Sequence, residues 1–328
     1  MNSKFLFKQT LGHFCVDAAC AAVVISGTSN IDESLVFFVL YNFLAFCLQP
    51  LAGIILDKTQ KIMPQQYILI SFVLLLLGFI PECCLWLKVF LVGVGNCLFH
   101  VGAGTIVLTE SDKKLAPLGI FVSGGAVGLM LGTMFAYNWI CHALLIVVLT
   151  WLISCNLTFQ SKRLLRVSSK INWGVVVLLC LCVTIRSFMG FMPVTQFTKT
   201  PWIIVLMTMG VFLGKSLGGI FCDHFGIKKT VVISTIFVML LFLFSFNNPY
   251  LWTLVQLIVN LSMPITLYLM YRSMPRYPAF SFGLAAACLV VGLLLTLPVK
   301  ELSLSPAWLL LLFVLNSYLI LFAERKLK

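Results

Sequence analysis

One short stretch of this chain occurs twice, and this repeat constrains the fold more than any other feature. The stretch LAGIILDKTQK (Leu51–Lys61) returns as LGGIFCDHFGIKK (Leu217–Lys229). Its aspartates, Asp57 and Asp223, stand 166 positions apart, which is about half of the 328 residues. Each copy ends a long apolar segment with a glycine, an aspartate about one turn later and a short basic loop. The repeat therefore predicts two halves of similar structure.

Composition excludes a soluble globular domain, because 61% of the residues are apolar, only 10% are charged and the mean hydropathy is +1.08. The net charge of +12 comes from short basic clusters between apolar runs. Such spacing indicates membrane topology rather than a nucleic-acid-binding face. Most of the twelve cysteines lie inside apolar segments, where cysteine behaves as a small hydrophobe. Without a C-x-x-C motif, we predict no metal site, no disulfide framework and no cofactor.

Twelve apolar segments are long enough to span a bilayer. They cover residues 5–27, 34–56, 62–80, 85–108, 115–136, 138–158, 172–194, 201–223, 230–247, 250–273, 278–299 and 305–323. The longest polar connection lies at the centre of the chain. We therefore predict an all-α integral membrane protein with two pseudo-symmetric six-helix bundles, 1–158 and 172–328, joined by a cytoplasmic linker, 159–171.

Lysines and arginines determine the predicted orientation, since cytoplasmic loops carry the excess of both. Seventeen of them fall on the side of the two termini, whereas the opposite side holds only Lys88, Lys199 and Lys300. Both termini are therefore predicted to be cytoplasmic. We expect a multi-pass protein of a plasma membrane, more specifically the bacterial inner membrane.

The repeated stretch resembles the loop signature of the major facilitator superfamily, G-x-x-x-D-(R/K)-x-G-(R/K)-(R/K). The second copy has Gly219, Asp223, Gly226, Lys228 and Lys229 in place, and the first keeps Gly53, Asp57, Lys58 and Lys61. The resemblance covers the whole chain. It implies the twelve-helix major facilitator fold, a monomer, and two loops that act as a gate on the cytoplasmic side.

Charged residues inside predicted spans mark a candidate site, because a charge within the bilayer is costly. Asp17 in the first span and Arg186 in the seventh both lie near mid-membrane by helix rise. In the fold that the resemblance implies, these two helices face each other across a central cavity. Asp17 and Arg186 are then partners or the two poles of a substrate site. A structural ion pair that locks the halves together is the alternative.

Two further charged or polar positions follow from the repeat, because Lys215 aligns with Gln49. This alignment predicts equivalent cavity positions in the second and eighth helices. A Lys215 side chain that reaches the inner surface is the alternative.

Three polar pairs have i, i+4 spacing, so the members of each pair share one helix face. They are His13 with Asp17, Asn96 with His100, and Gln256 with Asn260. Such faces on three helices predict a water-filled path. His13 and Asp17 form a candidate proton-coupling pair, because histidine titrates near neutral pH. A hydrated His13 that anchors the inner end of its helix is the alternative.

A finer resemblance rests on GVGNCLFHVGAG (Gly93–Gly104) and FVSGGAVGLMLG (Phe121–Gly132), together with HFCVD near the start and IRS in the seventh span. These runs are similar to the fosmidomycin-resistance branch of the superfamily. Val101 and Thr133 stand where that branch has proline. The branch implies efflux of a drug-like solute by antiport.

The absence of a nucleotide-binding loop and of protease or hydrolase motifs argues against an ATP-driven pump or an enzyme. The sequence predicts a secondary transporter that works by alternating access and couples to protons through Asp17. Two central cations, Arg186 and Lys215, favour an anionic or amphipathic organic solute. The alternatives are an uptake carrier or uniporter for a sugar or carboxylate, and a receptor or scaffold that does not transport.

Overall fold

The computed structural model describes residues 1–28, 31–59, 62–157, 170–191, 200–242, 248–299 and 306–328, and these residues form helices and no strand. Ten helical segments among them are long and apolar enough to cross a membrane. Two shorter apolar helices, α4 (Pro64–Gly78) and α11 (Ile227–Phe242), stand at the third and ninth predicted spans. Each of the twelve predicted spans thus corresponds to helix, and the chain is a multi-pass membrane protein.

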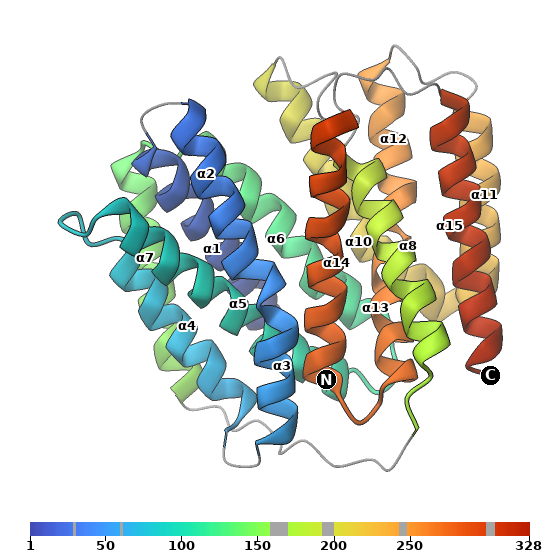
Figure 1. Cartoon of the computed structure of the whole chain (residues 1–328), viewed down its shortest axis with the longest axis horizontal. Helices are drawn as coiled ribbons and strands as arrows, with labels where there is room; N and C mark the ends of the chain where they lie inside the picture. The colour runs from blue at the N-terminus through green and yellow to red at the C-terminus, as the bar shows by residue number, and fades with distance from the viewer. Residues whose placement is uncertain (29–30, 60–61, 158–169, 192–199, 243–247, 300–305) are drawn as a thin grey trace. The chain divides into compact units, whose positions relative to one another are not determined.

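The remaining helices follow the other predicted spans closely (Figure 1). They are α1 (Ser3–Gly27), α2 (Ile31–Asn42), α3 (Gln49–Lys58), α5 (Leu85–Glu110), α6 (Ala116–Met134), α7 (Trp139–Leu157), α8 (Trp173–Phe191), α10 (Pro201–Phe225), α12 (Pro249–Asn260), α13 (Ser262–Ser273), α14 (Pro278–Val299) and α15 (Pro306–Lys326). Most of the predicted linker and the last residues of the seventh and ninth spans lie outside the described residues.

Two spans predicted as continuous helices are interrupted, and a proline explains each interruption. The second span passes from α2 through a π-helical turn, Phe43–Cys47, into α3, just before Pro50. The tenth span breaks at Leu261, between α12 and α13 and three residues before Pro264. Proline lacks an N–H and its ring crowds the carbonyl four residues earlier, so a regular α-helical turn cannot continue there.

The chain divides into two compact units. Unit 1 comprises Met1–Glu110, Gly124–Ser168 and Arg276–Ala287, and unit 2 comprises Ser111–Ser123, Ser169–Pro275 and Cys288–Lys328. The start of α6 therefore groups with unit 2, and the start of α14 groups with unit 1. The boundary predicted at residues 159–171 stays a prediction.

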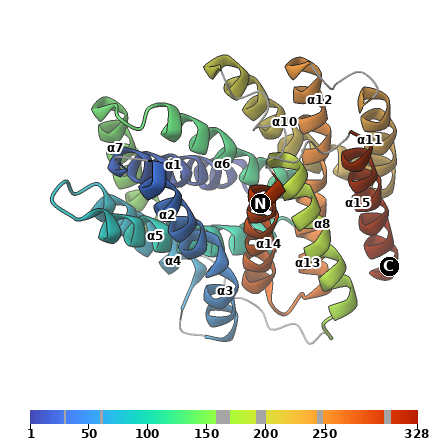
Figure 2. The ribbon, with the colours of Figure 1, turned by 45° about the horizontal axis from the view of Figure 1, so that its top comes forward.

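Each unit is a bundle of packed helices. Within unit 1, α4 and α5 lie side by side, α5 also packs on α1, and α7 packs on α1 and α4 (Figure 1). Within unit 2, α12 packs along α10, and α15 lies against α8 and α11 (Figure 2). Consequently α1 and α5 present facing surfaces inside unit 1, and α8 and α12 are close neighbours inside unit 2.

Glycines spaced four residues apart permit the closest helix contacts. On α6, Gly124, Gly128 and Gly132 face the backbone carbonyls of Thr10, Phe14 and Ala18 on α1. On α10, Gly210, Gly214 and Gly218 face the carbonyls of Thr253, Leu257 and Leu261. A Cβ at these positions would crowd or overlap the partner backbone, so only glycine allows this separation of helix axes.

We predict that Gly128→Ala destabilises the protein, because its Cβ would overlap the Phe14 carbonyl and force α6 away from α1. Overpacking of this kind costs about 1–3 kcal/mol. Thermal unfolding of the detergent-purified protein measures the effect. Gly190→Ala on α8 is the matched control, since a Cβ there meets no described atom within 4 Å. Equal melting temperatures for the two variants would show that the α1–α6 contact does not require glycine.

Candidate functional site

The repeated stretch makes two matching contacts, in each of which an aspartate caps the start of a helix. Asp57 in α3 accepts hydrogen bonds from the backbone N–H groups of Ala279 (3.1 Å) and Phe280 (2.8 Å), in the first turn of α14. Its first contact lies within unit 1. A carboxylate at this position satisfies N–H groups that have no partner inside the helix and favours the positive end of the helix dipole.

The second copy repeats this contact within unit 2. Asp223 in α10 accepts hydrogen bonds from the backbone N–H groups of Leu115 (2.8 Å) and Ala116 (2.9 Å), where α6 begins. The aspartates, at positions 57 and 223, are 166 residues apart, and the first donors, at 115 and 279, are 164 residues apart. The repeat in sequence is therefore also a repeat in structure.

Glycines one turn before the aspartates explain the spacing of the motif. A Cβ on Gly53 would lie 2.6 Å from the backbone carbonyl of Ala279, and a Cβ on Gly219 would overlap the carbonyl of Leu115. Each glycine thus lets a helix start come within reach of the carboxylate. The basic residues of the motif, Lys58, Lys228 and Lys229, are exposed and take no part in these hydrogen bonds. The gate function of the motif stays a prediction.

Two of the three predicted polar pairs form one buried cluster in unit 1. The Nε2 atom of His13 lies 3.3 Å from Oδ2 of Asp17 and 2.9 Å from Nε2 of His100. The Asn96 amide donates a hydrogen bond of 2.9 Å to Oδ1 of Asp17. Both histidines are 5% exposed. The spacing of each pair predicted one polar face on α1 and one on α5, and the packing of these helices brings both faces together.

The cluster has members that the sequence analysis did not identify. The Tyr41 hydroxyl accepts a hydrogen bond of 3.0 Å from the Asn96 amide, and the Cys20 sulfur lies 3.7 Å from the same nitrogen. A Cβ on Gly125 of α6 would overlap both Asp17 and His13. Cys20 stands three residues after Asp17, so its shared helix face was readable. Tyr41 carries no such spacing signal.

The donor atoms of His13, Asp17 and His100 all lie within 4.8 Å of one another. Two imidazole nitrogens and a carboxylate form a set that can hold a divalent transition metal. The sequence analysis predicted no metal site because it searched for ligands spaced along one segment, whereas these ligands come from two helices. The assignment of proton coupling to Asp17 and His13 stays a prediction.

Arg186 on α8 is the buried charge of unit 2. Its side chain is 4% exposed, and Nη1 donates to the sulfur of Met263. Among the described residues, Nε and Nη2 meet no hydrogen-bond acceptor. The third predicted pair lies near this helix, because Gln256 donates a hydrogen bond of 3.3 Å to the carbonyl of Gly190 and Asn260 donates one of 2.9 Å to the carbonyl of Gln256.

Gln49 and Lys215 occupy equivalent positions, as the repeat predicted. The backbone of Gln49 packs against Gly283 of α14, and that of Lys215 packs against Gly119 of α6. Gln49 is fully buried and donates a hydrogen bond of 2.8 Å to the Ala45 carbonyl, whereas Lys215 is half-buried. Their predicted role in lining a substrate cavity stays a prediction.

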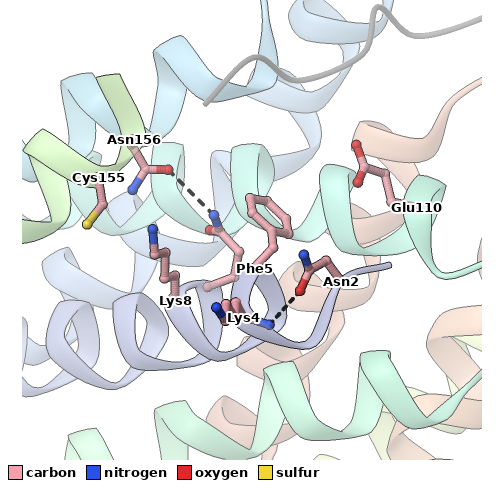
Figure 3. A pocket seen from close by; sticks show the side chains of 8 residues that line it. Asn2, Lys4, Phe5, Lys8, Glu110, Cys155 and Asn156 are labelled. Carbon is pink, nitrogen blue, oxygen red and sulfur yellow. Dashed lines mark hydrogen bonds between the residues drawn. The ribbon is translucent and has the colours of Figure 1, made fainter. Parts of the chain in front are cut away.

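A hollow of about 320 Å³ opens in unit 1 between the start of α1 and the ends of α5 and α7 (Figure 3). It is lined by Asn2, Lys4, Phe5, Lys8, Gln9, Glu110, Cys155 and Asn156. None of the residues predicted as site residues lines this hollow. The candidate site in unit 1 is therefore the buried polar cluster rather than this open depression.

Comparison with solved structures identifies the fold. The chain is similar to the E. coli fucose:proton symporter FucP, with a TM-score of 0.74, 12% identity and 98% of both chains covered. A structure of FucP in the outward conformation, described as a major facilitator superfamily transporter, gives a TM-score of 0.71 and 14% identity, again over 98% of both chains. The sequence matches no protein-family model and no curated protein. At such low identity the similarity shows the fold, which is the major facilitator fold. Nothing in it confirms the fosmidomycin-resistance branch.

We predict that Asp57→Asn and Asp223→Asn destabilise the protein by similar amounts, because their hydrogen bonds have the same geometry. An amide offers one acceptor oxygen in place of two and carries no charge, so each substitution costs about 0.5–2 kcal/mol. Thermal unfolding of the purified variants measures the loss. Asp112→Asn, in an exposed loop position, is the control. If the two variants unfold like this control, the caps do not hold the helix starts in place.

Proposed function

We propose that the chain is a secondary active transporter, not an enzyme, that moves a small organic anion across the membrane by alternating access. The observation that carries this proposal is Arg186, a buried guanidinium with two donor nitrogens that meet no acceptor among the described residues. The fold supports the transporter class. The solute class follows from the chemistry of the guanidinium.

A buried guanidinium needs an anion, because an unpaired charge inside the membrane costs several kcal/mol. The planar guanidinium offers parallel N–H donors that match a carboxylate or phosphonate group. The adjacent contact with the Met263 sulfur is a weak one, since thioether sulfur is a poor acceptor. Arg186 therefore supports an anionic solute better than the neutral sugar considered as an alternative. A drug-like solute rests on the branch resemblance alone.

The two helix caps support an alternating-access mechanism. Asp57 and Asp223 hold two helix starts through hydrogen bonds that carry no covalent constraint and that can break and form again. Repeat-related contacts of equal geometry are suited to a protein whose two halves move as rigid bodies. We propose that these contacts form the cytoplasmic gate of a monomer with both termini in the cytoplasm of a bacterial cell.

We also propose that protons drive the transport. One of the similar structures is a fucose:proton symporter, which shows that this fold supports proton-coupled transport of a small solute. The efflux by antiport that the branch resemblance implied gains no support from a symporter. A uniporter is the alternative to coupling.

We predict that Arg186→Gln lowers the transport of an organic anion by about 10–100-fold, which is the loss of a hydrogen bond to a charged group. Arg186→Lys keeps the charge but loses the planar fork, so we expect it to be intermediate. The assay uses sealed liposomes that contain a pH-sensitive dye. Organic anions, sugars and amphipathic drugs are added in turn under an imposed proton gradient.

The exposed Arg276 supplies the matched control, Arg276→Gln, for which we expect wild-type transport. Transport of a sugar but of no anion, or full activity of Arg186→Gln, would rule out anion recognition by Arg186. Solute flux without dye response would rule out proton coupling and leave a uniporter.

A further inference from the structure

The buried cluster of unit 1 has the geometry of a ligand set for one metal ion. The distances between its donor atoms are 2.9 Å for His13 Nε2 and His100 Nε2, 3.3 Å for His13 Nε2 and Asp17 Oδ2, and 3.9 Å for His100 Nε2 and Asp17 Oδ1. In a tetrahedral zinc site with bonds of about 2.0–2.1 Å, ligand atoms stand roughly 3.3 Å apart. Shifts of a few tenths of an ångström would place all three around one ion.

The hydrogen bonds of His100 and Asp17 fix their donor atoms toward this point. Nδ1 of His100 lies 3.0 Å from the backbone carbonyl of Asn96, which only accepts, so Nδ1 carries the proton and Nε2 presents its lone pair to the cluster. Metal-binding histidines are held in this way, by donation from the other ring nitrogen to a carbonyl or carboxylate. The Asn96 side chain donates to Oδ1 of Asp17 and leaves Oδ2 facing His13.

The surroundings suit a bound cation. The Phe46 and Phe99 rings have centroids 5.9 Å from that of His100, so part of the wall is apolar. An apolar wall strengthens the attraction between a carboxylate and a cation. The Asp17 side chain is 15% exposed, which gives the cluster one accessible member. On the α6 side Gly125 presents only backbone, and a side chain there would displace Asp17 and His13.

We propose that His13, Asp17 and His100 form a binding site for one divalent transition-metal ion. Imidazole nitrogens with one carboxylate select zinc-like ions over Mg²⁺ and Ca²⁺, which prefer oxygen ligands. Three protein ligands leave a fourth position for water or a solute group. This proposal does not rest on the transport function, because the binding is measured on purified protein without a membrane gradient.

The experiment titrates Co²⁺ into the full-length, detergent-purified chain, from which any affinity tag has been removed, and follows the visible absorption of the bound ion. We expect one Co²⁺ per chain, displaced by Zn²⁺ but not by Mg²⁺. His13→Gln, Asp17→Asn and His100→Gln should each abolish this absorption. Asn96→Ala keeps all three ligands but loses the bond to Asp17, and we expect its affinity to fall by about 10–100-fold.

His224→Gln is the matched control, because His224 is exposed and lies in unit 2. Thermal unfolding without metal identifies any variant that fails to fold, and Asn96→Ala then tests the site by itself. Zn²⁺ should raise the melting temperature of the wild type and of His224→Gln, but not of the ligand variants. The proposal is overturned if the wild type shows no Co²⁺ absorption, or if His13→Gln and His100→Gln bind Co²⁺ as the wild type does.

Discussion

The structure depends first on the capping of two helix starts by carboxylates that are distant in sequence. The first N–H groups of a helix have no partner within it, and a membrane interior offers no water to replace one. Asp57 and Asp223 supply these partners to α14 and α6. Each contact needs a glycine one turn earlier, because only a helix without a side chain at that point allows the capped helix to come so close. The G-x-x-x-D spacing is therefore a geometric requirement.

The same requirement, that buried polar groups find partners, is met differently by the two units. In unit 1 the side chains of His13, Asp17, Asn96 and His100 satisfy one another. In unit 2 the donors Nε and Nη2 of Arg186 meet no acceptor among the described residues. The repeat thus preserves the glycines and the caps, which build the scaffold, but not the buried polar groups. Function is expected where the two halves differ, since the scaffold alone recognises no solute.

The sequence predicted what depends on local pattern. Apolar length located all twelve spans, and i, i+4 spacing placed His13 with Asp17 and Asn96 with His100 on shared faces. It did not show that these faces meet, because the rotation of α1 against α5 depends on packing over the whole bundle. The interruption before Pro50 and the break before Pro264 were readable from proline chemistry. Tyr41 was not, because a single tyrosine in an apolar span follows no period.

The two proposed ligands have opposite charge, and each follows from its own unit. With neutral imidazoles, the cluster of unit 1 carries the single negative charge of Asp17, so a cation lowers its energy. Arg186 carries a positive charge, so an anion lowers the energy of unit 2. Neither site can serve the other's ligand, because His100 Nε2 and Asp17 present electron pairs whereas Arg186 presents only hydrogens. A metal ion at the cluster would change its net charge from negative to positive, and an anionic group from a solute or water would then suit the open coordination position. The chemistry of the buried groups, rather than the fold, therefore determines which ions and solutes this chain recognises.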